Sequence, residues 1–189
     1  MIKSRCAWCG EDPLYVAYHD QEWGVPVFSD DKLFEFLVLE TFQAGLSWIT
    51  ILRKRENFRK AFDDFDYQKI ATYGEDKYET LLLDAGIVRN KLKIRATIGN
   101  AQTFLKLQKE HGSFSNYFWK FSDGKPIQNQ RVDLSNVPAT SNLSDIISKE
   151  LKKQGFKFVG STVIYAFMQA VGMVNDHVED CFRNHQVLM

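Results

Sequence analysis

The stretch SDIISKELKKQGFKFVGSTVIYAFMQAVG, residues 144–172, does most to decide the fold. Ser144 and Asp145 are good N-cap residues, and they open the helical segment IISKELKKQ. The six-residue connection GFKFVG, bounded by Gly155 and Gly160, leads into a second apolar segment, STVIYAFMQAVG. Helix, glycine-bounded turn and helix together form a hairpin of two helices. Such a turn can present consecutive backbone N–H groups and a helix N-terminus to a phosphate.

Helical patterns also dominate the chain before this hairpin. Residues 31–41, DKLFEFLVLET, follow two good N-caps, Ser29 and Asp30, and their apolar side chains cover most of the helix circumference, which is typical of a buried helix. Further helical patterns lie over residues 48–62, about 78–86, and 91–111 before a glycine stop. Residues 113–142 are irregular and contain no strong strand. We therefore predict an all-α fold.

Length and composition fit one folded domain spanning residues 1–189. The chain is 44% apolar and 14% aromatic, which excludes a disordered or low-complexity protein. Its 24 basic and 24 acidic residues give no net charge. This balance argues against a polybasic tail, and a nucleic-acid partner would need only a local basic face.

The first residues, MIKSRCAWCGEDPLYVAYHD, contain no apolar run resembling a signal peptide, and three cysteines cannot form a closed disulfide set. No apolar stretch reaches the roughly 20 residues that span a bilayer. We therefore expect a cytoplasmic protein with reduced thiols and no membrane partner. A monomer is the default expectation for its oligomeric state.

Histidines and cysteines near both ends of the chain are candidate metal ligands. The spacing of His177 and Cys181 places both on one face of a helix. Together with Cys6, Cys9 and His19 they offer enough ligands for a tetrahedral zinc site of two cysteines and two histidines. Either the Cys6/Cys9 pair or the Cys6/His19 pair could complete the site. The alternative is that the cysteines are buried small apolar residues and the histidines are hydrogen-bonded in the core.

Aromatic side chains and one acidic residue form a second candidate site. Glu40 ends an almost wholly apolar helix and precedes QAGLSW, where an unpaired carboxylate must reach a partner or face a cavity. Flat walls and one carboxylate suit an electron-poor or cationic heterocycle. The alternative is that Glu40 pairs with Arg53 or Arg55 and the aromatics are ordinary core residues. The aromatic residues concerned are Tyr15, Tyr18, Trp23 and Trp48, with Trp8 nearby.

Basic residues surround the hairpin and occur in two other stretches. Lys152, Lys153 and Lys157 flank the turn, and RNKLKIR (89–95) and RKR (53–55) could add phosphate contacts. Basic stretches are also common on solvated helix faces, so this pattern leaves both interpretations open.

Five motifs together resemble one known family. They are RCAWCGEDPLYVAYHDQEWGVP (5–26), LFEFLVLETFQAGLSWITILRKRENFRKAF (33–62), DAGIVRNKLKI (84–94), KKQGFKFVG (152–160) and YAFMQAVGMVNDHVEDC (165–181). In this order they resemble the 3-methyladenine DNA glycosylase I family, constitutive alkylation-repair enzymes of bacteria. The resemblance covers nearly the whole chain, about residues 4–183.

The resemblance implies an all-α member of the helix-hairpin-helix glycosylase superfamily, with the helix-hairpin-helix at about 144–172 and one zinc ion that ties the termini together. The implied zinc ligands are Cys6, His19, His177 and Cys181. Cys9 occupies a position where the family does not require cysteine, and it remains a competing ligand. Four protein ligands leave no open coordination position, so the zinc is expected to be structural.

The resemblance also implies the substrate, which is double-stranded DNA containing 3-methyladenine. Water would cut the N-glycosidic bond and free 3-methyladenine would be the product. The implied catalytic residue is Glu40. The implied base-binding residues are Tyr15, Tyr18 and Trp48, with Trp8 and Trp23 as further walls. The implied DNA-binding residues are Gln43, Gly45 and Leu46 in a wedge loop, with Lys157 and Gly160 in the hairpin.

Two departures from the wider superfamily bear on mechanism. Phe158 stands where the first of two close glycines is usual, and Thr162 stands where lyase-type members carry a nucleophilic Lys, so no lyase activity is expected. The superfamily's catalytic Asp aligns with Asn175, or with Asp176 after a one-residue slip. Because the deoxynucleoside of 3-methyladenine is cationic and its bond already weak, Glu40 needs only to accept a hydrogen bond from the amino edge of the flipped base.

Two other functions compete with this one. A non-catalytic helix-hairpin-helix module would bind duplex DNA with a steep salt dependence and release no base. A zinc hydrolase of a small molecule would need an open metal position, and DNA would not affect its activity.

Overall fold

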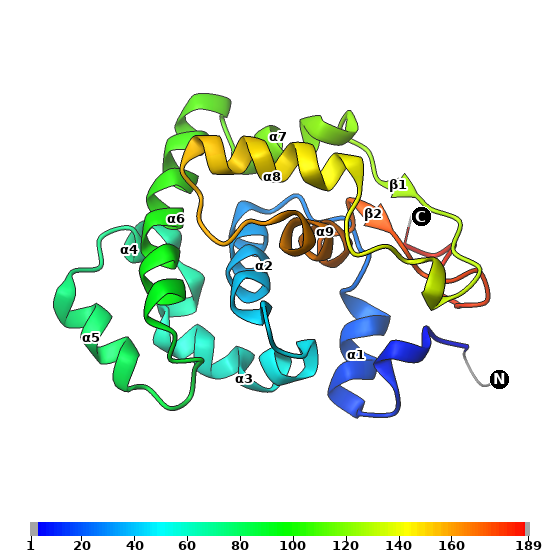
Figure 1. The fold of residues 1–189 in the computed structure, drawn as a ribbon, viewed down its shortest axis with the longest axis horizontal. Coiled ribbons are helices and arrows are strands. Elements are labelled where there is room, and N and C mark those ends of the chain that lie inside the picture. Colours follow the sequence, from blue (N-terminus) through cyan, green and yellow to red (C-terminus); the bar gives the residue numbers. More distant parts are fainter. Residues whose placement is uncertain (1–3, 188–189) are drawn as a thin grey trace.

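Helices make up most of the described chain, residues 4–187, in this computed structural model (Figure 1). The α-helices are α1 (Pro13–Gln21), α2 (Asp30–Gln43), α3 (Trp48–Ala61), α4 (Tyr67–Ile70), α5 (Glu75–Leu83), α6 (Lys91–His111), α7 (Phe114–Trp119), α8 (Asn142–Gln154) and α9 (Ser161–Ala170). Short 3-10 turns are η1 (Ala7–Cys9), η2 (Asp63–Phe65), η3 (Lys120–Ser122) and η4 (Leu134–Asn136). The strands β1 (Ile127–Gln128) and β2 (Val174–Asn175) pair in parallel. The helical fold class is confirmed, with this small sheet added.

Helix α2 runs through the middle of the molecule (Figure 1). Every residue from Leu33 to Phe42 is buried, and the helix contacts α3, α6, α7 and α9. The prediction of a helix that is buried nearly all round is therefore confirmed. Such a helix fixes the position of any polar side chain it carries, because each one must face a neighbouring element or a cavity.

The two helices of the predicted hairpin, α8 and α9, lie against each other. Helix α8 begins before the expected N-caps Ser144 and Asp145 because Ser141 caps it. The hydroxyl of Ser141 accepts from the amide of Ser144 (3.1 Å), while the Ser144 hydroxyl accepts from the amide of Ser141 (2.7 Å). Gly155 ends α8 with a φ of +114°, a left-handed conformation that glycine adopts without steric cost.

The region predicted to be irregular, residues 113–142, contains helix α7 and strand β1. The hydroxyl of Ser113 caps α7 by accepting from the amide of Asn116 (2.9 Å), a signal that the sequence did carry. Ile127 pairs with Val174 and Gln128 with Asn175, a pairing too short to produce an alternating pattern.

The C-terminal segment does not form the helix expected for His177 and Cys181. Arg131 forms a parallel bridge with Val178, and the amide of Glu179 donates to the carbonyl of Arg131 (2.8 Å), so the backbone there is extended. The amide of Phe182 donates to the carbonyl of Ser4 (3.0 Å), which joins the two ends of the described chain. Within residues 4–187, no helix has the length and apolar character needed to cross a membrane.

Candidate functional site

A cavity of about 210 Å³ lies between the first helix, α2, α3 and α9. The structure brings Glu40 and all five of the predicted aromatic residues to this one cavity. Its lining consists of Trp8, Tyr15, Tyr18, Trp23, Glu40, Gln43, Trp48, Leu134, Val137, Ala166 and Gln169.

The aromatic wall follows from how α1 begins. The carboxylate of Asp12 caps the helix by accepting from the amides of Leu14 (3.0 Å) and Tyr15 (3.3 Å). The same carboxylate pairs with Arg53 of α3 (2.7 Å), which fixes α1 against α3. Tyr15 and Tyr18, three residues apart, therefore share the helix face that meets the cavity.

The rings of this wall touch one another. The ring centres of Trp8 lie 4.9 Å from Tyr15 and 5.0 Å from Trp23, and those of Tyr18 and Trp48 are 5.2 Å apart. Ring pairs at such separations pack favourably. The cavity is therefore walled by a continuous set of flat faces rather than by isolated rings.

Glu40 contributes the one carboxyl of the lining. It is only 3% exposed, and within residues 4–187 no side chain or backbone group hydrogen-bonds its carboxyl. Burial raises its pKa to about 8. Arg53 pairs with Asp12 and Arg55 with Glu22 and Glu35, so the alternative that Glu40 is held in an ion pair is wrong.

Two further polar atoms of the lining also lack a partner among the described residues. They are the indole nitrogens of Trp8 and Trp48, both buried. A buried donor or acceptor without a partner costs roughly 1–3 kcal/mol. Two indole N–H donors and one carboxyl, all unsatisfied in one aromatic cavity, indicate a site built to receive a polar, flat molecule.

The loop after α2 carries three of the predicted DNA-binding residues. Gln43 lines the cavity, Gly45 has a φ of +85°, and Leu46 is 41% exposed at the loop tip. Lys93 holds this loop by donating to the carbonyls of Phe42 (3.0 Å) and Ala44 (2.7 Å). Lys93 is therefore buried, and it is neither a phosphate contact nor part of a solvated helix face, the two interpretations left open for residues 89–95.

The hairpin turn carries the other two predicted DNA-binding residues. Asn100 of α6 holds its backbone, accepting from the amide of Lys157 (2.8 Å) and donating to its carbonyl (3.1 Å). Phe158 has a φ of +57°, the left-handed region that explains why a glycine is usual there. Among residues 4–187, no side chain caps α9 after Gly160, so its first N–H groups are left for another acceptor.

The predicted metal ligands also lie together. Each of Cys6, His19 and Cys181 offers one potential ligand atom, and these three atoms lie within 4.8 Å of one another. All three residues are buried. The sulfur of Cys181 is 3.4 Å from Nε2 of His19, near the about 3.6 Å between sulfur and nitrogen ligands of tetrahedral zinc. His177 lies outside this tightest group, yet its ring centre is 5.1 Å from that of His19. The thiol of Cys9 instead donates to the carbonyl of Cys6 (3.2 Å).

Both imidazoles are oriented for a ligand role. Nδ1 of His19 is 2.8 Å from a carboxylate oxygen of Asp20, and Nδ1 of His177 is 2.8 Å from the amide oxygen of Asn175. Nε2 of His177 is buried without a hydrogen-bond partner in the described chain. Burial lowers the pKa of His177 to about 4, which keeps the ring neutral. Nδ1 engaged and Nε2 presented is the arrangement that metal-binding histidines adopt.

This cluster shares a wall with the cavity. The ring of His177 lies 4.5 Å from Trp23, and the ring of His19 lies 5.3 Å from Trp8. Because Trp8 and Trp23 also line the cavity, the cluster that joins the chain ends supports part of the aromatic wall.

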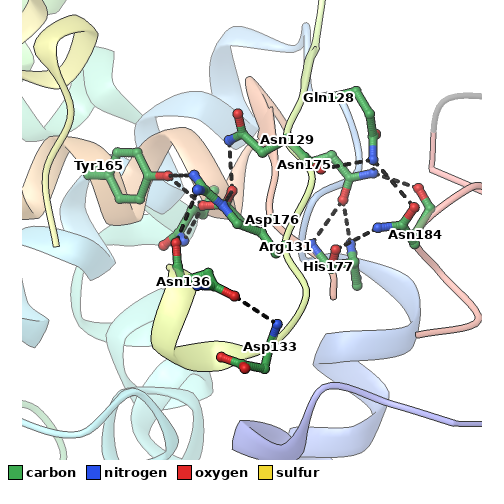
Figure 2. A network of polar contacts seen from close by, with 11 residues as sticks. Gln128, Asn129, Arg131, Asp133, Asn136, Tyr165, Asn175, Asp176, His177 and Asn184 are labelled. Atoms are coloured by element: carbon green, nitrogen blue, oxygen red, sulfur yellow. Dashed lines mark hydrogen bonds and ion pairs between the residues drawn. The ribbon is translucent and has the colours of Figure 1, made fainter. Parts of the chain in front are cut away.

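Asn175 and Asp176, the two candidates for the superfamily's catalytic position, are engaged elsewhere (Figure 2). Asn175 donates to the carbonyl of Asn184 (2.7 Å) and accepts from His177. Asp176 is 1% exposed and pairs with Arg131 (2.8 Å). Neither residue belongs to the cavity lining.

A helical fold with a cavity of aromatic walls and one unpaired carboxyl, beside a hairpin with free N–H groups, defines a class of enzymes that bind a flat base taken from DNA, the DNA glycosylases. Within this class, the chain belongs to the methyladenine glycosylase family, whose model matches residues 8–184. The family predicted from the five motifs is therefore confirmed, as is the prediction of a glycosylase.

Known proteins resemble the chain over nearly its whole length. It is 51% identical to DNA-3-methyladenine glycosylase 1 of Escherichia coli K12 over 177 residues, which cover 94% of this chain and 95% of that protein. A crystal structure of 3-methyladenine DNA glycosylase I matches with a TM-score of 0.92 at 50% identity, covering 95% and 98% of the two chains. A structure concerning 3-methyladenine recognition by the Staphylococcus aureus enzyme matches with a TM-score of 0.92 at 37% identity, covering 95% and 96%.

Sequence reasoning missed four residues of the cavity. Leu134 and Val137 come from the region considered irregular, and Ala166 and Gln169 come from the second hairpin helix. Gln169 carried a signal, since it is a polar residue inside the otherwise apolar segment STVIYAFMQAVG. Leu134 and Val137 carried none, because their place depends on the pairing of β1 with β2.

Proposed function

We propose that this protein removes 3-methyladenine from alkylated double-stranded DNA by hydrolysing its N-glycosidic bond after the nucleotide has flipped into the cavity. The observation that carries the proposal is Glu40, buried without a partner among flat aromatic faces. A free carboxyl in an aromatic cavity suits a base that is flat, positively charged and rich in N–H donors at one edge. The product is free 3-methyladenine.

In the proposed reaction the protein has to bind the flipped base but does not have to protonate it. The flipped base is a cation, so when the C1′–N9 bond breaks, its electron pair neutralises the departing base. Water then adds to C1′ of the sugar and loses a proton to solvent. Glu40 accepts a hydrogen bond from the amino group, while Tyr15, Tyr18 and Trp48 hold the ring by stacking. Interactions that strengthen as the bond breaks supply the acceleration.

No covalent intermediate with the protein is needed. Thr162, at the start of α9, stands where lyase-type enzymes carry a lysine, and a hydroxyl cannot form a Schiff base. The proposed enzyme is therefore monofunctional and leaves an abasic site in an intact strand.

Contacts with the duplex are proposed at two places. Leu46 enters the stack where the base has left, and Gln43 and Gly45 shape the loop that carries it. An apolar wedge offsets part of the few kcal/mol that unstacking costs. Lys157 and the N-terminus of α9 at Gly160 bind backbone phosphates, as expected of a helix-hairpin-helix protein.

We further propose one structural zinc ion bound by Cys6, His19, His177 and Cys181. The support is the clustering of their ligand atoms and the unpartnered Nε2 of His177. Bound zinc would supply a cross-link between the two ends of the chain and, with four protein ligands, no activated water. Asp20 and Asn175 orient the two imidazoles toward it.

We also propose the number of domains, the oligomeric state and the cellular location of the protein. A single domain over residues 1–189 is supported because the amide of Phe182 donates to the carbonyl of Ser4, which joins the two ends of the described chain. A monomer is proposed as the default oligomeric state. A cytoplasmic location is supported by three buried cysteines without disulfides, Cys6, Cys9 and Cys181.

Chromatography of bases released from methylated DNA tests the proposed function. Wild type is expected to release 3-methyladenine, and Glu40→Gln to release far less while keeping the same helical content and zinc stoichiometry. Glu79→Gln, at an exposed position of α5, is the matched control and should behave as wild type. Duplex binding without any base release would favour the non-catalytic DNA-binding module instead, and would refute the proposal.

A further inference from the structure

We propose that Gln169 is a second polar determinant of the cavity, which selects a positively charged base because Asp176 holds its side-chain carbonyl oxygen available to the ligand. Gln169 lies on α9 and lines the cavity. Its side-chain nitrogen donates to a carboxylate oxygen of Asp176 (2.8 Å). Its side-chain oxygen accepts no hydrogen bond from any described residue. The inference rests on the proposed function and adds to it the origin of charge selectivity.

The neighbours of Asp176 explain why the amide has one orientation. Its two carboxylate oxygens accept from Arg131 (2.8 Å), Asn129 (2.7 Å) and Tyr165 (2.6 Å) (Figure 2). They also accept from Gln169. A carboxylate paired with a guanidinium offers only lone pairs. The Gln169 amide must therefore turn its NH2 group toward Asp176 and its oxygen away.

The carboxylate itself is firmly placed. Arg131 also donates to the hydroxyl of Tyr165 (3.0 Å) and to the carbonyl of Asn136 (3.0 Å), so the network joins α9 to the segment before α8. Asp176 follows strand β2 directly, and its backbone is fixed by the pairing of that strand with β1. Reversing the amide would place the Gln169 oxygen against a fixed carboxylate, which like-charge repulsion and a lost charged hydrogen bond both oppose.

A fixed acceptor discriminates by charge. The oxygen of Gln169 can receive N–H or polarised C–H groups of a cationic purine, but it cannot donate to a lone pair of a neutral one. Glu40 on α2 and Gln169 on α9 both line the cavity, so a cation would meet acceptors from two helices. Asp176 never touches the base and acts through Gln169, which makes it a positioning residue.

Two ligands of the same shape test this directly. One is 3,9-dimethyladenine, which carries a permanent positive charge and has no sugar to lose. The other is 3,9-dimethyl-3-deazaadenine, its neutral counterpart with carbon in place of N3. Titration calorimetry gives the ratio of their dissociation constants for each variant. Gln169→Leu should lower the wild-type preference for the cation roughly tenfold, the usual scale for one hydrogen bond to a charged group. Gln68→Leu, exposed on α4, is the control and should keep the preference.

A paired exchange separates positioning from simple structural support. Asp176→Asn alone permits the Gln169 amide to turn and should also lower the preference. Adding Gln169→Glu restores the arrangement, because the new amide of residue 176 donates to one oxygen of residue 169 and leaves the other for the cation. The double variant should therefore regain at least the wild-type preference. Gln169→Glu alone carries the same added carboxyl without the restored hydrogen bond, so a merely structural role for Asp176 would leave the double variant no more selective than that single variant.

The outcomes distinguish a failure of the inference about Gln169 from a failure of the proposed function. If wild type prefers the cation and Gln169→Leu prefers it equally, the inference about Gln169 is refuted while the proposed function stands. If the double variant stays impaired, the positioning role of Asp176 is refuted. If wild type binds neither ligand, the proposed function fails, and the inference fails with it.

Discussion

Glu35 and Glu40 are two buried carboxyls on one helix with opposite surroundings. They are 4% and 3% exposed, so burial alone does not distinguish them. The carboxylate of Glu35 forms ion pairs with Lys32 (2.8 Å), Arg55 (2.7 Å) and Arg59 (2.7 Å). Burial by itself would raise the pKa of Glu35, but Arg55 and Lys32 lower it below its usual range. Burial raises the pKa of Glu40 to about 8, and no cation opposes it.

The difference follows from the geometry of α2. Five residues turn a helix by roughly 140°, so the two side chains leave α2 in different directions. One meets the basic residues of α3, and the other meets the aromatic cavity. A buried carboxyl that is paired with cations helps to hold the fold together. A buried carboxyl without such a partner is tolerated where a bound ligand supplies the missing hydrogen bond or charge. The predictions below test this contrast.

The largest effect is expected on stability, at Glu35. Glu35→Ala leaves Arg55 and Arg59 without their shared carboxylate, and breaking a buried pair in this way costs about 3–5 kcal/mol. Urea unfolding should show this loss, while excision per folded molecule stays near that of wild type. Unchanged stability would mean that the ion pairs of Glu35 do not distinguish it from Glu40.

At Glu40 the loss should fall on activity instead. Glu40→Gln keeps the shape but cannot pair as an anion with a cationic base, and removing one such electrostatic contact costs on the order of 100-fold in rate. Single-turnover release of 3-methyladenine measures the effect. A rate equal to that of wild type would remove Glu40 from the mechanism.

Trp48→Ala should affect ligand binding without affecting the charge of Glu40. Loss of one stacking face weakens binding of free 3-methyladenine by about 1–3 kcal/mol. Fluorescence or calorimetric titration gives the affinity. The same affinity in the variant would show that the ring of Trp48 is only part of the core.

Per pH unit, the smallest effect is a dependence of stability on pH. Between about pH 4.5 and pH 8 the folded protein holds a proton on Glu40 that the unfolded chain has lost. The contribution of Glu40 to stability therefore falls by about 1.4 kcal/mol per pH unit as pH rises through this window, and is constant above it. Subtracting the unfolding free energy of Glu40→Gln from that of wild type at each pH isolates the slope. A difference that does not change with pH would mean that Glu40 is ionised in the folded protein.

Local patterns allowed much of this to be predicted from sequence. The apolar run of α2, the glycines around the α8–α9 turn and the aromatic residues of the first quarter each reflect a nearby physical requirement. The roles that depend on distant pairing were not predictable. Gln169 acquires its role from Asp176, and Lys93 was interpreted as a surface charge because only the fold brings it to the carbonyls at the end of α2.

Lys93 donates to the carbonyls of Phe42 and Ala44, and these hydrogen bonds lower the entropic cost of the proposed insertion of Leu46 into DNA. A loop whose carbonyls are already held loses little conformational entropy when its tip enters a gap between bases. The cost of ordering this segment is met when the chain folds rather than at each encounter with the duplex. In the proposed complex with DNA, Leu46 would therefore enter the stack at the tip of a loop that is already ordered.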